Sequence, residues 1–136
     1  MLEKIKDHSK NLKSIYELEG EEGQFEYLIE IGKMSDSLQK SEKIESNKMN
    51  GCLAQVWIIK NKKNNKFYFY GDSDAMIVKG LVKIITESLS GYTVDEIRNL
   101  KHNLVNDLGL GAGLSARRQV GMMAMVDHIK IISGAK

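Results

Sequence analysis

Residues 71–89 read GDSDAMIVKGLVKIITESL, the segment around which the rest of the chain is expected to pack. Its apolar residues wrap most of the circumference of a helix, which predicts a central helix that is buried on nearly every side. These residues are Met76, Ile77, Val78, Leu81, Val82, Ile84, Ile85 and Leu89. Gly80 costs about 1 kcal/mol inside a helix relative to alanine, and close approach of a neighbouring element would offset that cost. Asp72, Ser73 and Asp74 precede the helix and are expected to cap its free N–H groups rather than to form an acid/base pair.

Two further helices are expected before the central one. Apolar residues at helical spacing predict helices over residues 2–17 and 24–32, with a break at Gly20 and Gly23 between them. Gly32 is the expected stop of the second helix. Polar residues 33–48 then predict a loop, with room for a short strand near Ile44.

A β-hairpin is expected between this loop and the central helix. Residues 53–60 alternate with apolar side chains on both faces, which predicts a covered strand. Residues 61–65 read NKKNN and predict a turn, and KFYFY at 66–70 predicts the partner strand.

Beyond the central helix, TVDE at residues 93–96 predicts a capping box and a short helix. A last helix is expected from Ser115 towards Ile132. The residues predicted to supply its inner face are Val120, Met123, Ala124, Val126, Ile129 and Ile131. The order of elements predicts an α+β fold, in which a small antiparallel sheet of about three strands packs against helices. We expect a single domain spanning residues 1–136.

Composition excludes several classes of function. The chain has 136 residues and a net charge of +2, from 20 basic and 18 acidic residues, so it lacks the basic excess of a nucleic-acid-binding domain. No stretch approaches the ~20 apolar residues of a membrane span. The charged N-terminal residues do not resemble a secretory signal, so a cytoplasmic location is expected. The single cysteine excludes an intrachain disulfide, a CxxC redox pair and a cysteine-rich metal site.

That cysteine, Cys52, lies in NGCLAQVW at residues 50–57. Gly51 permits an unusual backbone turn that lifts the Cys52 side chain into a loop tip, and the first strand begins directly behind it. A lone cysteine is often a small buried residue with a packing role. In this setting it is also a candidate nucleophile that is partly shielded by apolar neighbours.

Other candidates for chemistry are weaker. GLGAG at residues 109–113 lacks the spacing of a phosphate-binding motif and is interpreted as the entry to the last helix. No pair of histidines has the spacing of metal ligands, although His102 or His128 can meet Cys52 in space to form a hydrolase pair. The methionines at 122, 123 and 125 are interpreted as adaptable core residues and not as a metal site. No metal site is therefore predicted.

Four blocks of the sequence together resemble the SufE family of sulfur acceptor proteins. They are FEYLIEIG at 25–32, NGCLAQVW at 50–57, GDSDAMIVKGL at 71–81 and LSARRQVGM at 114–122. The blocks occur in the order of the family and cover most of the chain from residue 25. The resemblance implies a SufE/IscU-like fold, which agrees with the order of elements predicted above.

The resemblance also implies a function. SufE-type proteins accept sulfane sulfur from a pyridoxal-phosphate cysteine desulfurase, SufS or a relative, and pass it towards iron–sulfur assembly by scaffolds such as SufBCD. Cys52 falls on the acceptor cysteine and Arg118 on the arginine of the last-helix motif. Gly51, Gln55 and Asp74 are expected to join Arg118 in binding the partner. The protein itself needs no cofactor in this scheme, because the pyridoxal phosphate belongs to the desulfurase, and it is expected to be a monomer or weak homodimer.

Two positions depart from the family pattern. Ala54 stands where the family usually has serine, which removes a hydroxyl near the thiol, and Ala116 replaces the motif proline beside Arg117. The nucleophile remains. A persulfide needs protection from solvent, so Cys52 is expected to lie in an apolar niche that opens against the partner. The alternative from a different class is an interaction or regulatory domain of the same fold in which the cysteine is structural.

Overall fold

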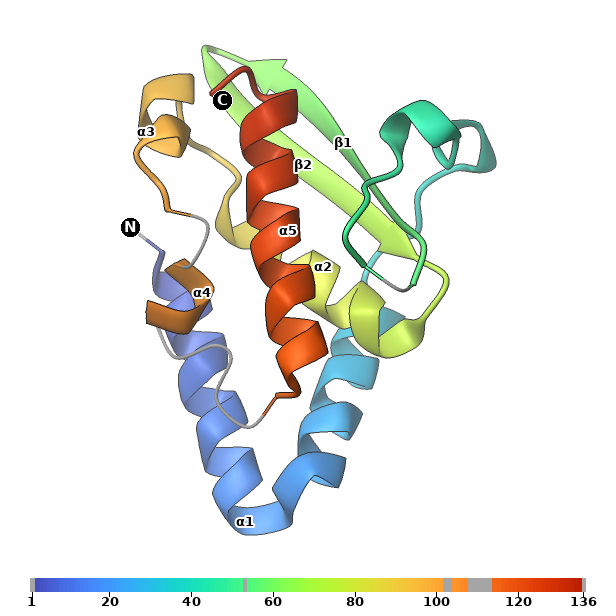
Figure 1. Cartoon of the computed structure of the whole chain (residues 1–136), viewed down its shortest axis with the longest axis vertical. Coiled ribbons are helices and arrows are strands. Elements are labelled where there is room, and N and C mark those ends of the chain that lie inside the picture. The colour runs from blue at the N-terminus through green and yellow to red at the C-terminus, as the bar shows by residue number, and fades with distance from the viewer. Residues whose placement is uncertain (1, 53, 102–103, 108–113, 136) are drawn as a thin grey trace.

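Helix α2 (Met76–Ser88) lies at the centre of the fold, as its apolar circumference predicts. In this computed structural model, which describes residues 2–52, 54–101, 104–107 and 114–135, α1, the β-hairpin and α5 all pack against α2 (Figure 1). Five of its apolar residues are at most 1 % exposed, counting the residue that caps its C-terminus. They are Leu81, Val82, Ile84, Ile85 and Leu89.

Helix α1 (Glu3–Met34) is bent into two limbs at Gly20, whose φ of 72° and ψ of −159° are not helical. The two limbs form a V in Figure 1 and correspond to the two predicted helices. Gly23 does not contribute to the break, because it lies buried inside the second limb. Gly32 is not the C-terminal stop that the sequence predicts, since the helix continues to Met34.

The role of Gly32 is instead to let α1 and α2 cross closely. A Cβ at Gly32 would lie 2.6 Å from the carbonyl oxygen of Met76 in α2. A Cβ at Gly80 would overlap the carbonyl group of Leu28 in α1. The two glycines therefore bring the two backbones into direct contact, which confirms the close approach predicted for Gly80.

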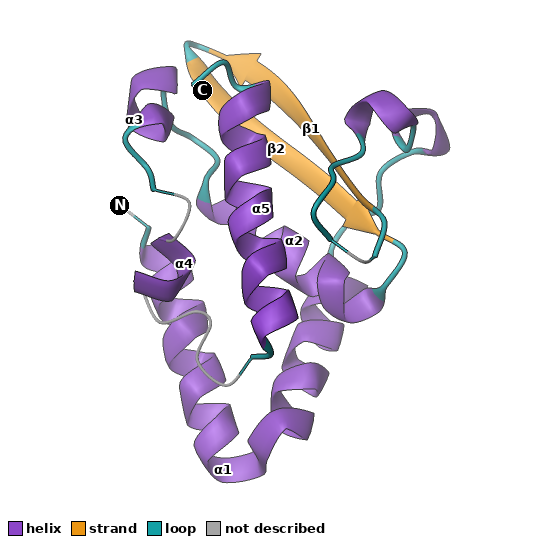
Figure 2. Ribbon diagram, in the orientation of Figure 1, coloured by secondary structure: helices purple, strands orange, loops and turns teal. Residues whose placement is uncertain are grey.

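The sheet is an antiparallel hairpin of β1 (Val56–Lys63) and β2 (Lys66–Ser73). Asn64 and Asn65 form its two-residue turn with φ of 52° and 65°, the left-handed conformation that asparagine tolerates. The described residues add only single bridges at its edges, Lys48 to Trp57 and Phe67 to Tyr92, where about three strands were predicted. Residues 40–42 and 45–47 form 3₁₀ turns, so the polar loop does not form a third strand (Figure 2).

The prediction that Asp72 and Asp74 cap α2 is wrong. The helix begins at Met76, and its N-cap is Ala75, whose side chain has no group that can cap the helix. Of the three predicted residues, Ser73 bonds at this end, since its hydroxyl oxygen accepts from the Ala75 N–H at 3.2 Å. Asp72 remains in β2, is 2 % exposed, and pairs with the Nζ of Lys79 at 3.5 Å and of Lys43 at 3.4 Å. Its carboxylate also accepts a hydrogen bond from the Leu38 N–H at 3.1 Å, so it ties the polar loop to the sheet and to α2.

The C-terminal half contains α3 (Val94–Arg98), α4 (Leu104–Asp107) and α5 (Ala116–Ile132). The predicted capping box of Thr93 and Glu96 is present at the start of α3. Residues 109–113 and His102 lie outside the described residues. Across the residues that the structure describes, no helix is both long and apolar enough to cross a bilayer.

The inner face predicted for α5 is partly wrong. Val120 is 54 % and Ile131 57 % exposed, whereas Gly121, Met122 and Met125 are buried beside Val126 and Ile129. Because residues 120–126 are almost entirely apolar, hydrophobicity alone does not mark which side of this helix faces the core. The interpretation of the methionines as core residues is confirmed for Met122 and Met125.

Substitution Gly80→Ala tests the helix crossing. We expect it to lower the free energy of unfolding by about 1–3 kcal/mol, because the new Cβ displaces the α1 backbone. Gly121→Ala is the matched control, since in the described part of the chain a Cβ there would meet the Cys52 sulfur at an ordinary contact distance of 3.6 Å, and the change should not destabilise the fold. Urea denaturation measures both variants. Equal stability of the Gly80 and Gly121 variants would contradict the close crossing.

The pH dependence of stability provides a second test. Burial lowers the pKa of His8 and of His128 below the ordinary value of 6.5, and His8 Nδ1 also lies 2.7 Å from the hydroxyl oxygen of Tyr27. Both rings bind a proton more readily in the unfolded chain than in the folded one. The stability that the neutral rings contribute to the folded protein is therefore complete above pH 6.5, and it is lost as the pH falls below that value. We expect His128→Gln to flatten the decline in unfolding free energy between about pH 7 and about pH 5. Parallel profiles for the variant and the wild type would rule out this contribution.

Candidate functional site

Cys52 lies on the loop before β1, and this loop rests on α5 through small residues. Gly51 adopts φ 95°, and a Cβ at Gly51 would lie 3.0 Å from the Cβ of Ala124. The Cys52 sulfur faces Gly121, because a Cβ at Gly121 would lie 3.6 Å from Sγ. The thiol is half-buried. The left-handed Gly51 agrees with the unusual backbone turn predicted from the sequence, whereas the contact of Cys52 with α5 was not predicted.

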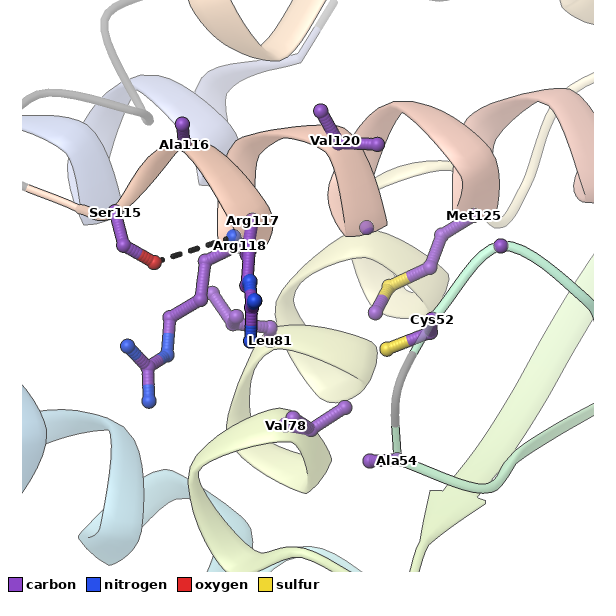
Figure 3. Close-up of a pocket in the computed structure, with 12 residues that line it drawn as sticks. Cys52, Ala54, Val78, Leu81, Ser115, Ala116, Arg117, Arg118, Val120 and Met125 are labelled. Carbon is purple, nitrogen blue, oxygen red and sulfur yellow. Dashed lines mark hydrogen bonds between the residues drawn. The ribbon is translucent and has the colours of Figure 1, made fainter.

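The thiol borders a pocket of about 810 Å³ between this loop, α2 and α5. Among the described residues, its lining is mainly apolar and includes two arginines but no acidic residue and no histidine. The lining residues are Gly51, Cys52, Ala54, Val78, Leu81, Ser115, Ala116, Arg117, Arg118, Val120, Gly121 and Met125. Figure 3 shows Cys52 on one side of the pocket and the two arginines on the other, at the first turn of α5.

Arg118 is held in place by neighbours on two elements. Its backbone N–H donates to the hydroxyl oxygen of Ser115, the N-cap of α5, at 3.3 Å. Its guanidinium carbon lies 4.8 Å from the centre of the Phe25 ring on α1, within the range of a cation–π interaction. Its Nε is buried and has no hydrogen-bond partner among the described residues. The described part of the chain forms no ion pair to Arg117 or Arg118.

Gln55 and Asp74 form a separate contact that does not line the pocket. The Gln55 N–H donates to the Asp74 carboxylate at 2.9 Å, and the Gln55 carbonyl oxygen accepts from the Ser73 hydroxyl at 2.7 Å. The Asp74 N–H also donates to that carbonyl oxygen at 3.3 Å. These bonds fasten the end of the Cys52 loop to the connection between β2 and α2. Of the predicted site residues, Gly51, Cys52 and Arg118 therefore meet at the pocket, and Gln55 and Asp74 anchor the loop.

This arrangement suits chemistry at a single thiol. His128 lies on α5 but does not line the pocket, so it forms no hydrolase pair with Cys52 there, and His102 lies outside the described residues. The described residues also contain no group of three or more His, Cys, Asp or Glu placed to hold a metal ion. The apolar walls limit the contact of the half-buried thiol with water, and the two arginines favour a negatively charged ligand.

Several residues of the site were not predicted. Val78, Leu81 and Met125 form walls of the pocket but were expected only as core residues, and Phe25 was expected only as part of the helix over residues 24–32. The contact between Phe25 and Arg118 joins residues 93 positions apart in the chain. No local pattern of sequence indicates such a pair, so only the packing of α5 beside α1 reveals it.

Comparison with known proteins gives consistent results. Residues 9–132 match the family model of SufE, described as an Fe–S metabolism associated domain. A SufE-like protein of Rhizobium etli is 36 % identical over 114 residues, which cover 80 % of this chain and 77 % of the relative. The sulfur acceptor protein CsdE of Escherichia coli is 33 % identical over 110 residues, which cover 79 % and 75 %.

A solved structure shares the fold. The solution structure of a hypothetical protein from Thermus thermophilus aligns with a TM-score of 0.71 at 16 % sequence identity. The alignment covers 96 % of this chain and 93 % of the other. At this identity the match bears on architecture alone, and it supports the α+β arrangement described above.

A double-mutant cycle tests the contact between Phe25 and Arg118. We expect Phe25→Leu and Arg118→Met to show a coupling free energy of about 0.5–1 kcal/mol in urea denaturation, because either change alone removes the cation–π interaction. Arg117→Met is the matched control, since Arg117 neighbours Arg118 and lines the same pocket. It should show no coupling to Phe25. Equal coupling for both arginines would contradict the specific contact.

Proposed function

Because the chain belongs to the SufE family of Fe–S metabolism associated domains, we propose that it is a sulfur acceptor that receives persulfide sulfur on Cys52. The donor in this proposal is a pyridoxal-phosphate cysteine desulfurase of the SufS type. The observation that carries the proposal is the half-buried thiol of the only cysteine, placed beside an apolar pocket that two arginines also line. The similarity to a relative named as a sulfur acceptor protein supports it.

The transfer step needs only one thiol on this chain. The Cys52 thiolate attacks the outer sulfur of the donor's persulfide, and a new S–S bond forms at Sγ. The S–S bond of the donor breaks, and the donor cysteine leaves as a thiolate. No net oxidation or reduction occurs. Pyridoxal phosphate acts earlier, in the desulfurase, and in this scheme the acceptor carries no cofactor.

The arginines at the pocket suit recognition of an acidic partner surface. Arg117 and Arg118 have no carboxylate partner among the described residues, so docking against a carboxylate creates an ion pair without breaking one. Phe25 holds the Arg118 guanidinium before the partner arrives, which lowers the entropy lost on binding. We assign to Gly51 a place in the same contact, because it is exposed at the mouth of the pocket.

Gln55 and Asp74 contribute through the loop. Their hydrogen bonds fix the end of the Cys52 loop, while its other face rests on α5 through small residues. A loop held this way can lift from α5 at Cys52 without losing its anchor. We therefore include in the proposal that docking exposes the thiol, and that the bound sulfur then passes, in the cytoplasm, to an iron–sulfur scaffold such as SufBCD.

Desulfurase turnover tests this proposal. With saturating cysteine and a reductant, the wild-type protein should raise the rate of alanine formation by a SufS-type desulfurase, because transfer to Cys52 frees the donor thiol. Cys52→Ser should lose all of this stimulation. Ile131→Ala is the control, since Ile131 is 57 % exposed near the other end of α5 and should behave as the wild type.

A Cys52→Ser variant that stimulates the desulfurase as strongly as the wild type would overturn the proposal. That result would favour the alternative, an interaction domain whose cysteine is structural.

A further inference from the structure

Gly121 lies at a position of α5 where the protein with a free Cys52 thiol does not need a glycine for packing. It is buried in the second turn of a 17-residue helix, where alanine is intrinsically preferred. At Gly32 and Gly80 a Cβ would strike the backbone of another helix, but at Gly121 its only neighbour within 4 Å among the described residues is the Cys52 sulfur, at 3.6 Å. That distance is an ordinary van der Waals contact. An alanine would therefore fit against the free thiol.

An alanine at position 121 would not fit against a persulfide on Cys52. An S–S bond is about 2.05 Å long, so an outer sulfur directed from Sγ towards α5 would lie within roughly 2 Å of a Cβ at Gly121. Carbon and sulfur make favourable contact only at nearly twice that separation. A Cβ at Gly121 would therefore overlap an outer sulfur held on this side of the Cys52 thiol, whereas a glycine adds no side-chain atom there.

Neighbouring contacts favour this side for the outer sulfur. A Cβ at Gly51 would lie only 3.0 Å from the Cβ of Ala124, so the loop already lies near α5 one residue before Cys52. Gly121 lines the pocket together with Val78, Leu81 and Met125, and Figure 3 shows Met125 beside Cys52. An outer sulfur between Sγ and Gly121 would be covered by apolar side chains and shielded from dissolved thiols.

We propose that Gly121 is a positioning residue for the sulfur-loaded state, in which its missing side chain holds open a niche for the outer sulfur of a Cys52 persulfide. This inference rests on the proposed function. It predicts that a methyl group at position 121 affects the protein with a Cys52 persulfide but not the protein with a free Cys52 thiol. The thiol form should be unaffected, whereas the persulfide should be forced towards solvent.

The test loads Cys52 chemically and so needs no desulfurase. The Cys52 thiolate attacks a sulfane sulfur of sodium tetrasulfide, an S–S bond of the reagent breaks, and the shortened polysulfide leaves. After the reagent is removed, excess glutathione thiolate attacks the outer sulfur and releases the Cys52 thiolate and glutathione persulfide. Intact-mass spectrometry follows the loss of one sulfur from wild type, Gly121→Ala, Gly121→Ser and the Ile131→Ala control.

We expect glutathione to strip the persulfide about tenfold faster from Gly121→Ala than from the wild type, which is the effect of a moderately overpacked site. Gly121→Ser should be at least as fast, and Ile131→Ala should match the wild type. In the reduced proteins, the melting temperature of Gly121→Ala should be equal or higher, and the rate of Cys52 alkylation by iodoacetamide should be unchanged.

Equal persulfide lifetimes in wild type and both Gly121 variants would contradict the proposal that Gly121 leaves a niche for the outer sulfur. So would a lower melting temperature or a changed alkylation rate for Gly121→Ala, because the Cβ would then disturb the thiol form as well. Failure of the proposed function is seen separately, as absence of Cys52-dependent stimulation of a desulfurase by the wild-type protein.

Discussion

The close crossing of α1 and α2 is the constraint on which the other features depend. Gly32 and Gly80 remove the side chains that would hold the two helices apart, so α2 lies directly against the backbone of α1. This position turns Val78 and Leu81 towards α5, where they form one wall of the pocket. It also fixes the connection between β2 and α2, to which the Cys52 loop is fastened. The geometry around the thiol is therefore a consequence of two glycines on helices that do not carry it.

The site itself is assembled on the N-terminal half of α5 from parts distant in sequence. The loop seats Gly51 and Cys52 against Ala124 and Gly121, and Arg118 lies one turn earlier on the same helix. Phe25 on α1 holds the guanidinium of Arg118. The pocket thus combines a protected sulfur with a preorganised positive charge. A protein that accepts sulfur from a partner needs both, since the cargo must be shielded and the partner must be recognised.

Local features could be predicted from the sequence, and features that depend on packing could not. The bend at Gly20, the capping box at Thr93 and the close approach at Gly80 follow from short patterns with a direct physical cause. The exposed side of α5 does not, because its run of apolar residues makes Val120 and Met122 equally plausible core residues. Asp72 was expected to cap α2, but two lysines and the Leu38 N–H bind its carboxylate instead. Of the site, the sequence indicates Cys52 and Arg118, whereas Phe25 and the pocket walls appear only in three dimensions.

Peptide-level mass spectrometry shows directly whether Cys52 carries sulfur. The protein is incubated with a SufS-type desulfurase and cysteine, the free thiols and persulfides are alkylated, and the digested peptides are analysed with and without prior reduction. We expect one added sulfur on the peptide that contains Cys52, and we expect reduction to remove it. A Cys52 peptide without added sulfur, in a sample in which the desulfurase's own cysteine carries a persulfide, would contradict this expectation.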